Sequence, residues 1–199
     1  MMWTPPDGCR GLIFDCDGTL VDSMPLHYEV WVTVLRRYGL EYPEARFYEW
    51  AGTPNDEIVR RLAVEQGVAC DHVAVAAERD AFFHDLPESA LRPVRAVVDI
   101  VRASYRALPM AVATGSTRTS AEASLRAIGI LDFFDAVVTA NDAGRPKPAP
   151  DVFLLAAALI GVAPANCAAF EDGDLGLQAA RSAGMLAVDI RPWLPKRKS

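Results

Sequence analysis

Short apolar runs recur along this chain, and each is followed by a turn or loop residue. Apolar runs of only a few residues are typical of buried strands. Because they are apolar almost throughout, they fit a parallel sheet that is covered on both faces. The predicted strands are 11–14, 109–113, 135–139, 167–170 and 185–190.

Apolar residues recur with helical spacing between the later runs. Strands that alternate with helices indicate parallel strands joined by crossover helices. The pattern therefore predicts an α/β fold, a doubly wound parallel sheet, built from residues 10–22 and 91–192. Its predicted helices are 94–106, 117–128, 150–160 and 174–183.

Residues 23–90 break this rhythm and contain no convincing strand. Gly39 and Gly67 are suited to end two of the helices predicted there, and Pro43 and Pro54 to begin others. A helical block inserted after the first strand predicts a cap domain that acts as a lid over that strand's end. Its predicted helices are about 25–38, 43–50, 55–66 and 71–86.

Composition narrows the class of protein. The 199 residues suffice for one good core with a small inserted domain. A formal net charge of −6 argues against nucleic acid as the main partner. No apolar stretch approaches the ~18 residues of a membrane span, so we expect no membrane partner. The N-terminus lacks a secretory signal, so we expect a cytoplasmic protein with reduced cysteines. We also expect a monomer.

Four polar segments follow predicted strands or loops in a fixed order. The first begins with Asp15 and Asp17, which lie two residues apart at a strand end, so an extended backbone points both to one side. Carboxylates leave water only for a partner, a metal or a reaction. The other three segments are Thr114-Gly115-Ser116, Lys147-Pro148-Ala149-Pro150-Asp151 and Glu171-Asp172-Gly173-Asp174-Leu175-Gly176.

With these segments in this order and a helical block after the first, the chain resembles the haloacid dehalogenase superfamily of phosphotransferases. Within it, the chain is most similar to the β-phosphoglucomutase-like branch, and there to bacterial phosphatases of fructose 1-phosphate and 6-phosphogluconate. The resemblance spans about residues 10–190. It implies a Rossmann-like core with a helical cap, a Mg²⁺ cofactor and a small phosphorylated sugar as substrate.

The resemblance assigns roles to the acidic residues, and these roles agree with their chemistry. Asp15 is the candidate nucleophile, forming an aspartyl phosphate. Asp17 is the candidate acid and base for the leaving sugar oxygen and the attacking water. Asp15, Asp172 and the backbone carbonyl of Asp17 are the expected Mg²⁺ ligands, with Glu171 orienting them from outside. The alternatives are a turn or N-cap pair for Asp15 and Asp17, and a solvated loop for Glu171 and Asp172.

Two segments are expected to bind the phosphate. Thr114, Gly115 and Ser116 offer hydroxyls and backbone N–H groups at a helix start, which favours anions. The alternative is that Ser116 or Thr117 only caps the helix. Lys147, in a loop stiffened by prolines, is expected to neutralise the phosphate and the Asp15 carboxylate.

The cap is expected to contact the sugar. His27 and Trp31 lie four residues apart on one helix face, and the family places His and Trp there against the catalytic acid and the sugar; core positions are the alternative. Mutases of the family carry an arginine in the cap loop, whereas Asn55 stands at the comparable position here. Arg79 is the candidate to replace that charge in part.

The sequence thus predicts a Mg²⁺-dependent phosphatase of small sugar phosphates such as fructose 1-phosphate. The nearest alternative is a phosphosugar mutase of the β-phosphoglucomutase type, in which a sugar hydroxyl takes the place of water. An alternative of another class is a non-catalytic, phosphate-binding regulatory module. The complete acid set with Lys147 argues against that last possibility.

Overall fold

The computed structural model describes residues 3–50, 53–87 and 90–194. The chain divides into two compact units. The α/β unit comprises Met1–Asp22 and Leu91–Ser199, and the helical unit comprises Ser23–Ala90.

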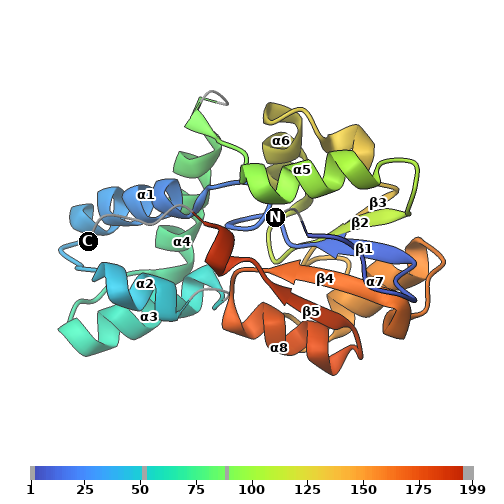
Figure 1. Cartoon of the computed structure of the whole chain (residues 1–199). Helices are drawn as coiled ribbons and strands as arrows, with labels where there is room; N and C mark the ends of the chain where they lie inside the picture. The colour runs from blue at the N-terminus through green and yellow to red at the C-terminus, as the bar shows by residue number, and fades with distance from the viewer. Residues whose placement is uncertain (1–2, 51–52, 88–89, 195–199) are drawn as a thin grey trace. The chain divides into compact units, whose positions relative to one another are not determined.

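A parallel sheet of five strands in the order β3-β2-β1-β4-β5 forms the centre of the α/β unit (Figure 1). Phe14 of β1 pairs with Val112 of β2 on one side and with Phe170 of β4 on the other. This register brings the carboxyl ends of the three central strands side by side. The strands are β1 (Gly11–Phe14), β2 (Met110–Ala113), β3 (Ala136–Val138), β4 (Cys167–Glu171) and β5 (Leu186–Asp189).

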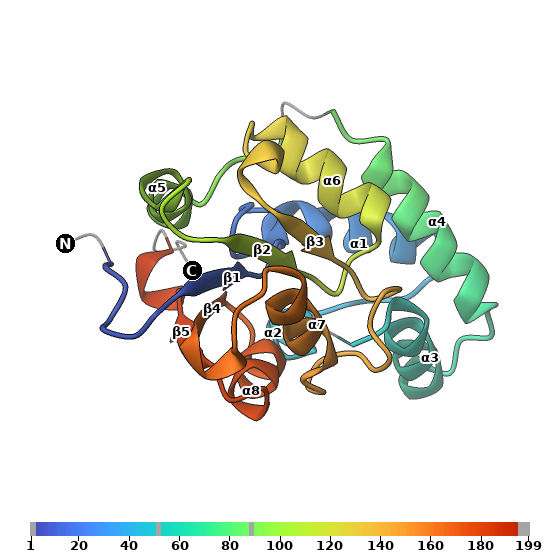
Figure 2. The ribbon, with the colours of Figure 1, turned by 90° about the vertical axis from the view of Figure 1, so that its right-hand side faces the viewer.

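Four helices cover the sheet, α5 and α6 on one face and α7 and α8 on the other (Figures 1 and 2). The predicted α/β fold with a doubly wound parallel sheet is confirmed. The helices are α5 (Arg95–Ser104), α6 (Arg118–Ala127), α7 (Asp151–Leu159) and α8 (Asp174–Ser182), with 3₁₀ turns at Leu131–Phe133, Pro164–Asn166 and Arg191–Trp193.

Side chains alternate between the two faces of the sheet, which explains why two separate apolar layers form. Phe14 points into the layer under α5 and stacks on Phe170, with ring centroids 4.6 Å apart. Ile13 points into the opposite layer, against Phe153 of α7. Because both faces are buried, the strands carry almost no polar residues until they end.

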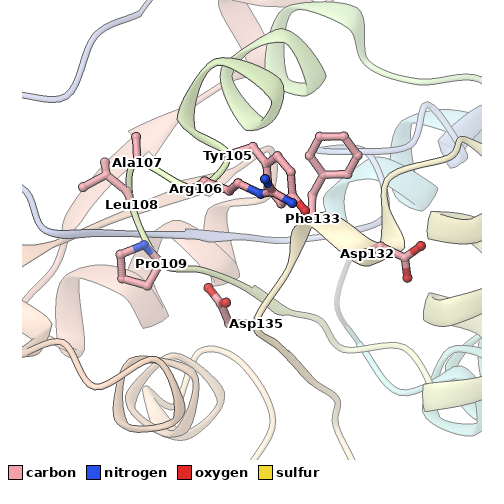
Figure 3. A pocket seen from close by; sticks show the side chains of 8 residues that line it. All are labelled: Tyr105, Arg106, Ala107, Leu108, Pro109, Asp132, Phe133 and Asp135. Carbon is pink, nitrogen blue, oxygen red and sulfur yellow. The ribbon is translucent and has the colours of Figure 1, made fainter.

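The amino edge of the sheet carries a hollow of about 410 Å³, lined by aromatic and charged side chains from the segments that lead into β2 and β3 (Figure 3). Tyr105 and Phe133 form an aromatic pair in its wall, with centroids 4.5 Å apart. Pro109 and Asp135 immediately precede strand residues. The hollow therefore lies at the opposite end of the strands from Asp15 and Glu171.

The helical unit consists of α1 to α4, and no strand occurs among its described residues. Gly39 and Gly67 follow α1 and α3 with φ of 69° and 66°, a conformation that favours glycine. Aromatic side chains fill much of its interior, with Tyr42 contacting Trp31 and Phe47. The helices are α1 (Met24–Arg37), α2 (Glu44–Glu49), α3 (Asn55–Gln66) and α4 (His72–His84). In the described part of the chain, no helix has the length and hydropathy that crossing a membrane requires.

Candidate active site

Acidic side chains converge where the central strands end. Asp15 directly follows β1, and its backbone N–H donates to Phe170 O at 3.0 Å. Glu171 is the last residue of β4, and Asp172 comes next. Asp15 and Glu171 are buried, so their charges depend on groups within the protein.

Lys147 supplies the positive charge at this point. Its Nζ donates to Asp15 Oδ1 at 2.7 Å, to Glu171 Oε1 at 2.6 Å and to Ala113 O at 3.1 Å. An ammonium group has three N–H donors, so these three acceptors use all of them. The structure thus brings Lys147, from the loop between β3 and α7, onto three neighbouring strand ends.

Asp172 reaches the site because Gly18 leaves room for it. Gly18 has a φ of 84°, and a Cβ placed on it would lie 2.1 Å from Asp172 Oδ2. Thr19 is fully buried and its Oγ1 donates to Asp172 Oδ1 at 2.9 Å. Thr19 is not among the predicted site residues, although the Asp-Gly-Thr order of the first motif is a signal for it.

Asp17 and the Thr114–Ser116 segment also meet. Ser116 Oγ donates to Asp17 Oδ2 at 2.6 Å, and Ser116 N donates to Thr114 Oγ1 at 3.0 Å. Thr117 is the N-cap of α6, accepting from Ser120 N at 3.3 Å. Of the two candidates for the helix cap, Ser116 and Thr117, it is Thr117 that caps α6, and the Ser116 hydroxyl faces the Asp17 carboxylate.

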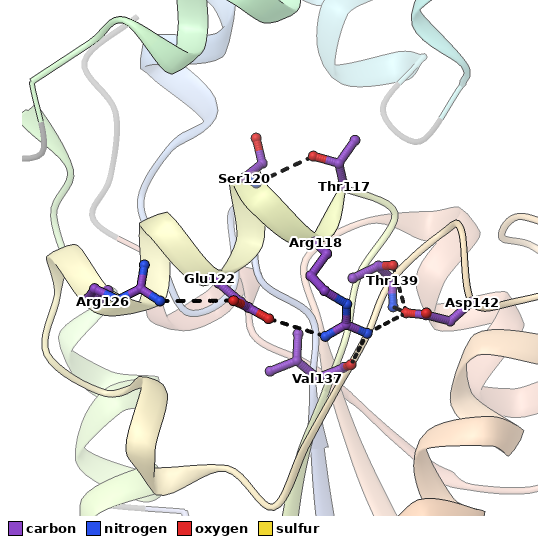
Figure 4. Close-up of polar contacts among 8 residues, drawn as sticks. All are labelled: Thr117, Arg118, Ser120, Glu122, Arg126, Val137, Thr139 and Asp142. Atoms are coloured by element: carbon purple, nitrogen blue, oxygen red, sulfur yellow. Dashed lines mark hydrogen bonds and ion pairs between the residues drawn. The ribbon is translucent and has the colours of Figure 1, made fainter.

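A polar network ties the start of α6 to the end of β3 (Figure 4). Arg118 donates to Val137 O at 3.1 Å and to Asp142 Oδ2 at 2.9 Å. The same Asp142 oxygen accepts from Thr139 N and Oγ1. These contacts join the helix start that follows Ser116 to the loop that leads to Lys147.

Burial shifts the titration of the acids. Burial raises the pKa of Asp15 to about 7; the negative charge of Glu171 adds to this, and Lys147 opposes it. Burial also raises the pKa of Asp172 to about 7, with the Asp15 charge adding to the effect. Burial likewise raises the pKa of Glu171. For Lys147, burial lowers the pKa, but the Asp15 and Glu171 carboxylates outweigh it and the net direction is upward.

The acid cluster suits a divalent cation. Ligand atoms of Asp15, Glu171 and Asp172 all lie within 4.8 Å of one another. Carboxylate oxygens are the ligands that Mg²⁺ prefers. Burial and the neighbouring carboxylates raise the pKa of Asp15 and of Asp172, and a cation at this point would supply the opposing charge. The donor set therefore fits Mg²⁺.

The predicted cap residues lie together within the helical unit. Asn55 Nδ2 donates to Asp80 Oδ1 at 2.8 Å, and Arg79 Nη1 donates to the same oxygen at 3.0 Å. Arg79 also hydrogen-bonds His27 Nδ1 and lies 5.3 Å above the ring of Trp31. Trp31 is only 2% exposed, which agrees with the alternative that it is a core residue of the helical unit. Asn55 and Arg79 thus share one carboxylate.

Comparison with known proteins identifies the family. Residues 9–184 match the haloacid dehalogenase-like hydrolases. Fructose-1-phosphate phosphatase YqaB of Escherichia coli is 42% identical over 181 residues, 91% of this chain and 96% of the relative. β-Phosphoglucomutase of Bacillus subtilis is 28% identical over 194 residues, 94% and 85% of the two chains. The crystal structure of β-phosphoglucomutase from Clostridium difficile superposes with a TM-score of 0.77, at 23% identity and covering 91% and 84% of the two chains.

The chain therefore belongs to the haloacid dehalogenase-like hydrolases. The predicted resemblance to this superfamily and its β-phosphoglucomutase-like branch is confirmed. The prediction of a phosphatase enzyme of this type is confirmed as well.

The raised pKa values predict an unusual dependence of stability on pH. In the folded protein Asp15 and Asp172 titrate near 7, against an ordinary value of 3.8. Between these pH values the folded state binds more protons than the unfolded state, so stability falls as pH rises. In chelator, we expect a higher Tm at about pH 6 than at about pH 8, and Mg²⁺ should raise the Tm more at the higher pH.

The measurement is thermal unfolding followed by circular dichroism. Asp172→Asn should flatten the pH dependence, whereas Asp99→Asn, at an exposed acid on α5, should leave it unchanged. If the metal-free protein is more stable at about pH 8 than at about pH 6, the raised pKa values assigned to Asp15 and Asp172 are wrong.

Proposed function

We propose that this protein is a Mg²⁺-dependent phosphatase that hydrolyses small sugar phosphates, such as fructose 1-phosphate, through phosphorylated Asp15. The observation that carries the proposal is the placement of Lys147 between Asp15 and Glu171, at the cluster that also contains Asp172. Support for the substrate class comes from the Escherichia coli relative, which is named as a fructose-1-phosphate phosphatase.

The proposed reaction has two steps. A carboxylate oxygen of Asp15 attacks phosphorus, and the bond from phosphorus to the sugar oxygen breaks while Asp17 gives that oxygen a proton. Asp17 then takes a proton from water as the water oxygen attacks the same phosphorus. This step releases inorganic phosphate and restores Asp15. The Ser116 hydroxyl, 2.6 Å from Asp17, orients the carboxylate for both transfers.

We propose that the phosphate binds at the Thr114–Ser116 segment and beside Lys147, whose positive charge acts on it while its three N–H groups stay on Asp15, Glu171 and Ala113 O. Phosphoryl transfer needs mainly positioning and charge neutralisation, and Lys147 is placed to neutralise charge beside Asp15. The backbone N–H groups at the start of α6 would add dipoles of the right sign, as helix starts do for anions. Gly115 keeps this turn free of a side chain.

Asp15, Asp172 and the backbone carbonyl of Asp17 would hold Mg²⁺. When bound, the ion neutralises carboxylates that otherwise repel the phosphate. Glu171 contributes in another way, since its Oε1 already accepts from Lys147. We propose that Glu171 sets the position of Lys147 and does not bind the ion as a main ligand.

Removal of the metal should abolish turnover. Without a cation, the carboxylates of the site and the phosphate repel one another. Phosphate release should therefore stop after treatment with chelator and return on addition of Mg²⁺. Full turnover after exhaustive metal removal would refute the cofactor assignment.

The nucleophile and the acid–base group should respond differently to substitution. Asp15→Asn should abolish turnover, because an amide is a poor nucleophile towards phosphorus. Asp17→Asn should lower kcat by about 10²–10⁴, the usual contribution of a positioned acid or base. Asp174→Asn is the control, since this acid of the fourth motif has a side chain that is 83% exposed. Wild-type turnover by Asp15→Asn, with deamidation excluded, would remove Asp15 from this role.

The helical unit is proposed to be a cap that selects the substrate, with His27, Asn55 and Arg79 contacting the sugar and the buried Trp31 packing against Arg79. The charged residues of the helical unit favour a phosphatase reaction over a phosphosugar mutase reaction. A mutase must hold a phosphate at each end of its intermediate. Here Asn55 is neutral, and Arg79 is bound to the Asp80 carboxylate, which repels a second phosphate.

The monomeric, cytoplasmic state expected from the sequence stays a prediction.

Hydrolysis and isomerisation can be compared on one preparation. Fructose 1-phosphate or a similar hexose phosphate should release inorganic phosphate. β-Glucose 1-phosphate, primed with the 1,6-bisphosphate, should give little glucose 6-phosphate. The kcat/KM values decide: isomerisation faster by about tenfold, ~1.4 kcal/mol of transition-state preference, would favour the mutase. A screen of phosphorylated metabolites for phosphate release would then identify the substrate.

A further inference from the structure

Gly176 occupies a position where glycine is unfavourable for the helix itself. It is buried within the first turn of α8, and its φ is not in the left-handed range. Glycine inside a helix costs up to about 1 kcal/mol relative to alanine. The backbone conformation gives no reason for glycine here, so the reason must lie in what surrounds it.

The space that a side chain would fill at Gly176 holds the Glu171 carboxyl group. A Cβ placed on Gly176 would lie 1.9 Å from Glu171 Oε1, 2.0 Å from Cδ and 2.3 Å from Oε2. These are the three nearest atoms to that Cβ, and all belong to one carboxylate. An added methyl group would therefore displace the carboxylate first, before any backbone atom.

Glu171 cannot move aside without losing its contacts. Its side chain is 4% exposed, and its Oε1 accepts from Lys147 Nζ at 2.6 Å. Its Oε2 accepts from the backbone N–H of Gly173 at 3.3 Å. A shift large enough to admit a methyl group breaks the Lys147 contact, and Lys147 then keeps only Asp15 and Ala113 O.

We propose that Gly176 is a positioning residue for the phosphatase reaction, because its missing side chain gives Glu171 the space from which it holds Lys147 against Asp15. The inference rests on the proposed catalytic role of Asp15 and Lys147. It adds a residue of α8 that touches neither substrate nor metal. Its effect passes from Gly176 through Glu171 to the ammonium group.

The test is Gly176→Ala, with Gly173→Ala as the matched control. A Cβ at Gly173 would lie 3.8 Å from Glu171 Oε2, which is an ordinary contact, so the same methyl group is added next to the same carboxylate without a clash. We expect Gly176→Ala to lower kcat by about tenfold or more, because small misplacements of catalytic groups are costly. KM should change much less, and Gly173→Ala should stay near wild type.

Glu171→Asp separates this route from a general structural effect. The shorter acid withdraws its carboxylate from Gly176, so in that background Gly176→Ala should cost little further activity. Such non-additivity is expected when one residue acts through another. The same loss of kcat in both backgrounds, or wild-type kcat for Gly176→Ala, would overturn the proposal. If Gly176→Ala fails to fold, recovery of folding in the double variant supports the proposal, and its absence refutes it.

The assays should use an aryl phosphate as substrate, with circular dichroism to check folding. Wild-type turnover of this generic ester reports on the reaction at Asp15 without regard to the sugar. A wild-type protein that hydrolyses no phosphate ester would refute the proposed function. An active wild type with an unaffected Gly176→Ala variant would refute only the positioning role.

Discussion

A buried ammonium group joins the ends of three strands in this protein. Lys147 binds the acid after β1, the last carbonyl of β2 and the last acid of β4. Buried carboxylates without a partner are strongly destabilising, so Asp15 and Glu171 depend on this cation for their place in the fold. Even so, burial and the charges of the neighbouring carboxylates raise the pKa of Asp15 and of Asp172 to about 7.

The site is compact because glycines stand where the acids need space. Gly18 leaves space for the Asp172 carboxylate, and Gly176 leaves space for the Glu171 carboxylate. At both glycines a Cβ would overlap the carboxylate. Such clearances allow four acidic side chains and a lysine to share the carboxyl edge of a small sheet. Hydrogen bonds from Thr19 and Lys147 then hold the Asp172 and Glu171 carboxylates in position, as the positioning of a phosphoryl group requires.

Charge balance differs between the two units, each considered by itself. In the α/β unit negative charge exceeds positive charge at the site, which attracts a divalent cation. In the helical unit the guanidinium of Arg79 is bound to Asp80, and Asn55 adds no charge. The proposed substrate carries a single phosphate and needs no second cation, which agrees with the pairing of Arg79 with Asp80 in the helical unit. This agreement links the proposed chemistry to the proposed substrate class.

The sequence alone determined the strands, the helices and the order of the motifs. Buried parallel strands are apolar throughout and end abruptly at polar residues, so Asp15 and Asp172 were visible as local signals. Tertiary structure decided which atoms meet. The sequence placed Glu171 outside the metal site but could not show that its oxygen binds Lys147, 24 residues away. The sequence also could not reveal that Thr19 hydrogen-bonds Asp172 or that Gly176 leaves space for Glu171. These contacts depend on strand register and helix packing, which no local sequence pattern specifies.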